Sequence, residues 1–233
     1  MATAIPRKRV TDLLEERLRA DILGGHHAPH TLLPPERELA EYYGVNRTTL
    51  RHALSRLEHL GLVETRHGVG TRVLPFEQTA GAELIVTLLT ETGPDAIPQL
   101  LDARRLLGAL IAREAARSAK AADRAELRRA LTRLANAAPG SPAHEAENDV
   151  HRALAGATGN AVLRLLVNTF VRAYDPVREM LDAAFADPAE IAAELRPVID
   201  AIRSADPAAA EAAADAYLRA SANRFTRVLG GQS

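Results

Sequence analysis

GVNRTTLRHALSRLEHLGL, residues 44–62, is the stretch that decides how the first third of the chain folds. On a helical wheel of about 100° per residue, its apolar side chains share one face and must be core: Leu50, Ala53, Leu54 and Leu57. Cations and hydroxyl groups crowd the first turn instead, at Arg47, Thr48, Thr49 and Arg51. A helix dipole favours negative side chains at that end. The pattern therefore indicates either a chance cluster on a solvated helix or a helix end that meets an anion.

The sequence on both sides of this helix favours the second interpretation. A helix is predicted over residues 10–23, and Pro34-Pro35 precedes a short helical stretch, ERELAEYYG, that Gly44 closes. Asn46 is a good N-cap for the helix that follows. The stretch LVETRHGVGTRVL then has two β-prone arms around a glycine-containing turn and predicts a hairpin. Two helices and a hairpin in this order form a winged helix-turn-helix, in which the second helix reads the major groove of DNA.

These residues also carry a family resemblance. The segment LLPPERELAEYYGVNRTTLRHALSRLEHLGLVETRHGVGTRV closely resembles the winged-helix domain of GntR-family transcription regulators, and the resemblance extends over residues 10–74. It implies double-stranded operator DNA as the partner, with contacts from Arg37, Arg47, Thr48, Thr49 and Arg51 and with His67 and Gly68 in the minor groove. Because one winged helix offers few base contacts, we expect a homodimer on an inverted repeat.

Composition narrows the class of protein. The 233 residues include no cysteine, which excludes disulfides and thiolate metal sites. The longest apolar run, around Leu84–Leu89, is too short to span a bilayer, and the N-terminal stretch MATAIPRKRVTDLLEE lacks the apolar core of a signal peptide. We therefore expect a cytoplasmic protein with no membrane partner.

Charge is distributed unevenly but only weakly so. Residues 1–75 hold 11 Lys and Arg against 9 Asp and Glu, and residues 76–233 hold the remaining 18 against 21. This asymmetry is too small to predict nucleic-acid binding without the motifs above.

The rest of the chain is helical in pattern, so the predicted fold class is mainly α. Residues 1–74 form the winged helix-turn-helix, residues 75–81 a linker, and residues 82–233 an all-α effector-binding and dimerisation bundle. Breaks at glycine and proline delimit the predicted helices: 82–91, 95–119, 123–137, 143–157, 160–184, 187–204 and 207–229.

The stretch AENDVHRALAGATGN resembles the FCD domain of the FadR subgroup. In many FCD domains an aspartate and three histidines bind a divalent metal that holds a carboxylate effector. Glu147 and His151 are four residues apart and share a helix face, so they are weak candidates for two ligands. The positions matching the other two ligands hold Leu195 and Tyr217. A two-ligand site is weak, and we expect neither a bound metal nor another cofactor.

Three further stretches are similar to the fatty-acid-responsive regulators for which the FadR subgroup is named: FEQTAGAELIVTL, IPQLLD and YLRASANRF. This resemblance implies an effector site formed by Arg104, Tyr174, Tyr217, Ser221 and Phe225. The chain departs from that pattern where Leu181 and Leu195 replace tyrosines and where Phe225 replaces a tryptophan. The expected effector is a long-chain acyl-CoA or fatty acid that releases the protein from DNA, although each tyrosine could instead be a core aromatic with a bonded hydroxyl.

Two alternatives remain open from the residues. A small organic acid held by a divalent metal would need more ligands than Glu147 and His151. An enzyme using this pair as acid and base would need a nucleophile, an oxyanion motif or a phosphate-binding glycine loop, and the sequence offers none. We therefore expect a ligand-responsive regulator and no enzyme.

Overall fold

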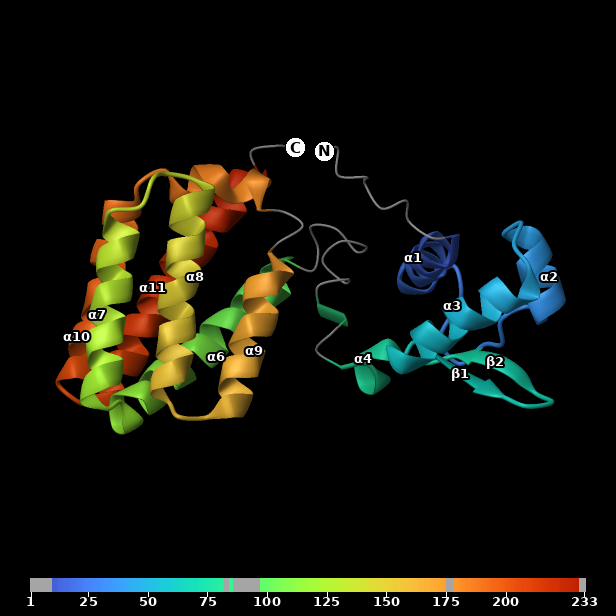
Figure 1. Ribbon diagram of the computed structural model, residues 1–233, viewed down its shortest axis with the longest axis horizontal. Coiled ribbons are helices and arrows are strands. Elements are labelled where there is room, and N and C mark those ends of the chain that lie inside the picture. Colours follow the sequence, from blue (N-terminus) through green and yellow to red (C-terminus); the bar gives the residue numbers. More distant parts are fainter. Residues whose placement is uncertain (1–9, 82–83, 86–96, 175–177, 231–233) are drawn as a thin grey trace, which may run out of the picture. The chain divides into compact units, whose positions relative to one another are not determined.

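The computed structural model describes residues 10–81, 84–85, 97–174 and 178–230. The chain divides into two compact units, Met1–Gly93 and Pro94–Ser233 (Figure 1). Most of the helix predicted over residues 82–91 lies outside the described residues. Across the described ranges, no helix is both long and apolar enough to cross a lipid bilayer.

The first unit is a winged helix-turn-helix, as predicted. Its elements follow one another as α1 (Val10–Leu23), α2 (Glu36–Tyr42), α3 (Arg47–His59), β1 (Val63–Arg66), β2 (Gly70–Val73) and α4 (Phe76–Thr79). The two strands are antiparallel and pair Val63 with Val73 and Arg66 with Gly70. A bridge between Leu32 and Arg72 adds a short third segment at the free edge of β2.

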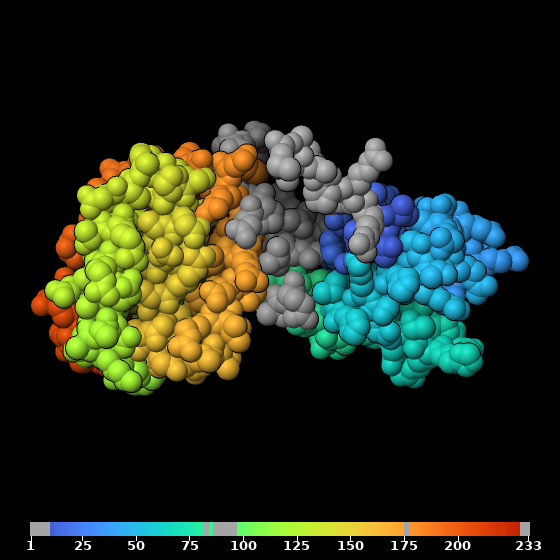
Figure 2. Space-filling model, in the orientation of Figure 1, coloured from blue at the N-terminus to red at the C-terminus, as the bar shows by residue number. Residues whose placement is uncertain are grey.

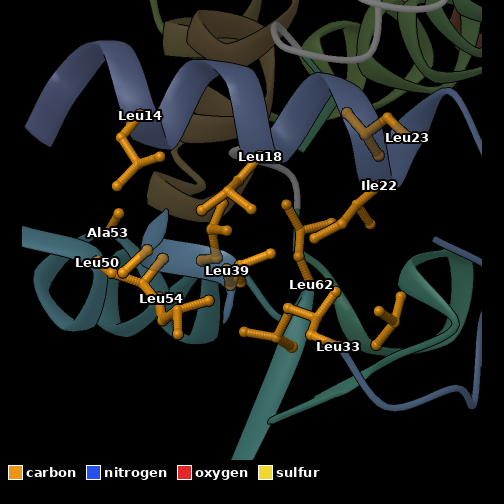
Figure 3. Close-up of a cluster of buried hydrophobic side chains, with 14 of the residues drawn as sticks. Leu14, Leu18, Ile22, Leu23, Leu33, Leu39, Leu50, Ala53, Leu54 and Leu62 are labelled. Carbon is orange, nitrogen blue, oxygen red and sulfur yellow. The ribbon is translucent and has the colours of Figure 1, made fainter. Parts of the chain in front are cut away.

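One leucine-rich core holds this unit together, and Figure 3 shows it beneath α1. Leu18 of α1 and Leu50 of α3 are fully buried, as is Leu62 at the start of the wing. Burying one leucine contributes about 1.5–3 kcal/mol, so the apolar face read from the helical wheel is what attaches α3 to α1. The polar face of α3 is left in solvent.

The residues predicted as a linker, 75–81, contain α4 and pack on the same unit. The Thr79 hydroxyl donates a hydrogen bond to the carbonyl oxygen of Gly61 at 2.8 Å. Gly61 has a φ of +72°, and a Cβ there would lie 2.5 Å from the Thr79 carbonyl oxygen. Only glycine satisfies both conditions, which explains why α3 ends there.

The second unit is an all-α bundle, as predicted. Its helices are α6 (Ile97–Ser118), α7 (Ala121–Ala135), α8 (Ser141–Ala157), α9 (Ala161–Ala173), the 3₁₀ helix η3 (Glu179–Phe185), α10 (Pro188–Arg203) and α11 (Pro207–Gly230). α11 packs along α6 and α10, and α7 packs against α8 and α10. Figure 2 shows α7, α8 and α9 side by side on one face of this unit.

The single helix predicted over residues 160–184 is wrong in extent. α9 ends at Ala173 with Tyr174 as its C-cap, and η3 begins only at Glu179. The sequence places Pro176 in this interval, and proline lacks the N–H that a continuous helix requires. The break matters for the site below because it places the Tyr174 ring at a helix end.

Candidate functional site

The exposed start of α3 is the first candidate site. The Asn46 side chain caps the helix by accepting a hydrogen bond from the Thr49 N–H at 2.8 Å. Arg51 donates from Nε to Glu36 Oε2 at 2.8 Å, and Arg47 Nη2 lies 3.5 Å from the same oxygen. Both guanidinium groups are exposed. One carboxylate of α2 therefore holds two cations at the helix end that an anion would approach.

The wing extends from the end of the same helix. The Thr65 N–H in β1 donates to Glu58 Oε1 of α3 at 2.9 Å, which ties the hairpin to α3. His67 and Gly68 lie exposed in the turn, and Gly68 has a φ of +77° that favours glycine. Arg37 is exposed on α2. All seven residues predicted to contact DNA thus belong to this unit, and all but the half-buried Thr49 are exposed.

The predicted effector residues come together around Arg104 in the second unit. Its Nη1 donates to Ser221 Oγ at 2.9 Å, and its Nη2 donates to Glu147 Oε1 at 3.0 Å. The guanidinium carbon also lies 5.9 Å from the centroid of the Tyr174 ring and 5.5 Å from that of Phe225. A buried cation is thus surrounded by one carboxylate, one hydroxyl and two aromatic faces, which is a cation–π arrangement as well as an ion pair.

Glu147 is the centre of the polar network, and its side chain is 1% exposed. Its Oε1 accepts hydrogen bonds from Arg104 and from the Tyr217 hydroxyl, and it lies 3.4 Å from His151 Nε2. His151 Nε2 also accepts from Arg104 Nη2 at 3.0 Å. The pair that the sequence offered as weak metal ligands is therefore bound to an arginine and a tyrosine.

Electrostatics keep this network charged. Burial alone would raise the pKa of Glu147, but the Arg104 guanidinium and the hydrogen bond from the Tyr217 hydroxyl hold it well below its ordinary value. Burial opposes the charge of Arg104 too, and the Glu147 carboxylate outweighs it and raises the pKa of Arg104. Burial raises the pKa of Tyr174 to about 12. Burial and the Glu147 carboxylate raise the pKa of Tyr217 as well. Both tyrosine hydroxyls therefore stay protonated and can donate hydrogen bonds.

This arrangement does not fit a metal ion. Within the part of the chain that the structure describes, no three His, Cys, Asp or Glu side chains are grouped to hold one. Leu195 is buried and offers no donor atom, and the Tyr217 hydroxyl is already committed to Glu147. The guanidinium of Arg104 supplies the positive charge that Glu147 needs, so a second cation next to it would be repelled.

Sequence reasoning missed one residue of this site, His144. It is buried on α8, three residues before Glu147, and its ring stacks on Phe185 at 4.5 Å between centroids. Among the described residues, its Nδ1 has no hydrogen-bond partner, and neither does the hydroxyl of Tyr174. The i,i+3 spacing to Glu147 was the available signal, because it places both side chains on one helix face.

His144 is expected to make the stability of the second unit pH-dependent. Burial lowers the pKa of His144 from its ordinary 6.5, so the unfolded chain binds the proton more readily than the folded one. Stability is then complete above pH 6.5 and is lost as the pH falls below it. Thermal unfolding of wild type and His144→Gln between neutral and mildly acidic pH measures this. If His144→Gln loses stability with falling pH as steeply as the wild type does, His144 is not the cause of the pH dependence.

A small cavity adjoins the network. Its volume is about 40 Å³, and α6, α8, α9 and α11 line it. Arg104, His151 and Tyr174 lie at its polar side, and its other walls are mostly apolar, including Val167, Phe170 and Leu218. This is a place where an apolar group could be buried next to a cation.

Comparisons with known proteins agree with both units. The family model "Bacterial regulatory proteins, gntR family" matches residues 11–73, and the FCD domain model matches residues 99–220. An HTH-type transcriptional regulator of Mycobacterium tuberculosis is 37% identical over 221 residues, covering 95% of this chain and 91% of the relative. A fatty acid metabolism regulator protein of Pectobacterium carotovorum is 36% identical over 156 residues, covering 66% of this chain and 64% of the relative.

The fold is found in solved structures. A GntR-family transcriptional regulator from Pseudomonas syringae pv. tomato superposes with a TM-score of 0.51 at 22% identity, covering 95% of this chain and 86% of that one. This likeness concerns the fold alone.

Proposed function

Because this chain belongs to the GntR family of DNA-binding transcription regulators and carries an FCD domain, we propose that it binds an inverted-repeat operator as a homodimer and is released by a long-chain acyl-CoA or fatty acid. The observation that carries the effector proposal is the buried Arg104, whose guanidinium adjoins an apolar cavity. The relatives named fatty acid metabolism regulators support the same class of ligand.

The proposed DNA contact follows from the exposed end of α3. Arginine can bridge O6 and N7 of guanine, and threonine can reach a base or a phosphate. Arg47, Thr48 and Arg51 all point away from the leucine core, so reaching DNA costs no packing. Base edges and phosphates would displace Glu36 from the two guanidinium groups.

Exposed apolar side chains on the second unit support the dimer. Two helices expose large apolar residues at helical spacing: Leu106 and Leu110 on α6, and Val162 and Leu165 on α9. Leu165 is 66% exposed and Val162 is 63% exposed, and an apolar partner surface that covered both side chains would remove them from water. A second copy of the chain would supply that surface.

Leu165→Glu is therefore expected to shift the protein from dimer to monomer at micromolar concentration and to weaken operator binding. A charge placed in an apolar interface must be buried without a partner. Sedimentation velocity and operator titration measure both effects. Met180→Glu is the matched control, because Met180 is a 43% exposed apolar residue in η3 of the same unit. A Leu165→Glu protein that remains dimeric would exclude α9 from the interface.

The effector site favours a ligand with an acidic or carbonyl head and an apolar tail. An anionic or carbonyl oxygen would compete with Glu147 for Arg104. The Tyr174 hydroxyl, which no described residue engages in a hydrogen bond, offers a further donor. A buried CH₂ contributes about 0.8 kcal/mol, so a long chain needs no metal to bind tightly.

The size of the cavity suggests how such a ligand would change the protein. A volume of about 40 Å³ has room for only a few water molecules, since one water needs about 10–15 Å³ of such space. An acyl chain can therefore enter only if the helices around the cavity move apart. Such a ligand binds the expanded bundle and not the closed one, which is the differential affinity that a population shift requires. α9 is the wall that packs mainly on a single helix, α8.

The test is a titration of a preformed operator complex with acyl-CoAs of increasing chain length. Release that strengthens with length is expected, and Tyr174→Phe should weaken it while leaving stability unchanged, because that hydroxyl has no hydrogen-bond partner within the described ranges of the chain. Indifference to every acyl-CoA, together with release by a short dicarboxylate and zinc, would overturn the proposal in favour of a metal-held organic acid.

A further inference from the structure

A second cavity lies beside the first and shares much of its wall. Its volume is about 30 Å³, and beyond His151 and Tyr217 its lining is apolar, with Leu154, Leu195 and Val198 among the residues. Five residues line both cavities: Gly108, Ile111, His151, Val167 and Leu218. The polar groups Arg104 and Tyr174 line the first cavity alone. The first cavity thus forms the polar end of the two, the second cavity forms the mostly apolar end, and the five shared residues form the partition between them.

Gly108 and Leu218 meet in the partition. A Cβ on Gly108 would lie 2.4 Å from Leu218 Cδ1, so the methyl group of Leu218 occupies the space that any other residue at 108 would fill. Gly108 is in the interior of α6, where glycine costs about 1 kcal/mol relative to alanine. No positive φ requires it, so the close approach of the Leu218 side chain is the reason that remains.

We propose that Leu218 is a gate between two halves of one acyl tunnel, and that Gly108 provides the notch through which a chain passes; this rests on the proposed acyl effector. Leu218 is buried, so its side chain can leave the partition only when the bundle expands around the ligand, as the small cavity already requires. Short chains fill only the first cavity beside Arg104. Chains long enough to displace Leu218 continue past Gly108 towards Leu195 and Val198.

The gate predicts a break in the relation between chain length and affinity. Each methylene buried in a continuous apolar tunnel strengthens binding about fourfold. Short chains should gain affinity up to the gate, stop gaining while Leu218 blocks them, and gain again once the second cavity opens. The two residues therefore set which chain lengths act as effectors.

Calorimetric titration of the full-length protein with butanoyl- to hexadecanoyl-CoA tests this. Leu218→Ala should remove the break, because the two cavities are then joined. Gly108→Ala should lower affinity for the long chains at least tenfold more than for the short ones, because the new methyl group fills the notch between the two cavities. Gly156→Ala is the matched control, since a Cβ on this α8 glycine would meet nothing within 4 Å.

A parallel series of straight-chain alcohols separates this proposal from the effector proposal, because alcohols carry no CoA. If the alcohol series shows a break in affinity and Gly108→Ala shifts it, the gate is supported even when no acyl-CoA binds. Failure of every acyl-CoA to bind would overturn the effector proposal but not the gate. If Gly108→Ala proves unstable, Gly108→Ala with Leu218→Ala removes the clash and should bind long chains less well than Leu218→Ala. Equal length dependence in wild type and all variants, in both series, overturns the gate.

Discussion

Glu147→Gln is expected to lower the free energy of unfolding of the second unit by about 3–5 kcal/mol, the usual cost of breaking a buried ion pair. The substitution keeps the shape of the side chain but removes the negative charge next to Arg104, which is 11% exposed. Ser221 and His151 still accept hydrogen bonds from the guanidinium, but neither carries a compensating charge. Chemical denaturation at neutral pH measures the change.

Two variants show whether the charge is the cause. Glu145→Gln on the same helix breaks ion pairs to Arg152 and Arg178, and because Glu145 is 47% exposed the loss should be under about 1 kcal/mol. Arg104→Met combined with Glu147→Gln removes both buried charges and should recover most of the stability. A double variant as unstable as Glu147→Gln would show that hydrogen bonding or packing is responsible instead.

Acid should have the same effect as the substitution. The pKa of Glu147 is depressed in the folded protein, so the ion pair stabilises the fold fully above the ordinary carboxyl value of 4.5. Its contribution is lost as the pH falls through the folded pKa, which lies lower. Glu147→Gln should therefore flatten the dependence of stability on pH in the acid range.

Arg51→Ala is expected to weaken operator binding by about 1–3 kcal/mol if the guanidinium pairs with a guanine. Arg47→Ala should behave alike, and His67→Ala in the wing should have a smaller effect. If the arginine binds a phosphate, its replacement should weaken binding to all DNA sequences equally. The slope of log affinity against log salt concentration should then fall by about one unit for each phosphate contact that is lost. Titrations of operator and scrambled DNA at several salt concentrations distinguish the two roles.

Arg56→Ala is the matched control on the same helix. Arg56 Nη1 donates to Asp12 at 2.7 Å and to Glu15 at 2.9 Å, so its charge is directed at α1. Its removal should leave the salt slope and the operator preference unchanged. If Arg47, Arg51 and His67 can all be replaced without loss of affinity, the DNA-reading surface lies elsewhere on the unit.

Much of the first unit could be predicted from the sequence because its determinants are local. The apolar period of 3.6 residues identified the buried face of α3, and Asn46 caps that helix through a residue three positions away. The wing turn likewise depends on Gly68 within the hairpin it closes. Interactions over so few residues are largely independent of how the rest of the chain packs.

The candidate residues of the second site came from the family resemblance, because a local pattern links only Glu147 with His151. Arg104 and Ser221 are separated by 117 positions, and Arg104 and Glu147 by 43. The period of apolar residues along the sequence also did not predict that α9 ends at Ala173 or that His144 is buried. Helical pattern shows which face of a helix is apolar, but not which neighbour covers it.

Two features were therefore decided by tertiary structure alone. The packing of α6 against α8 and α11 placed a guanidinium beside Glu147, and a buried carboxylate requires such a partner because its desolvation is otherwise too costly. The same packing brought the Leu218 methyl group against Gly108. The sequence by itself determined a winged helix with a cationic reading helix and an all-α second domain. The ion pair of Arg104 with Glu147, and the contact of Leu218 with Gly108, exist only where helices distant in sequence meet.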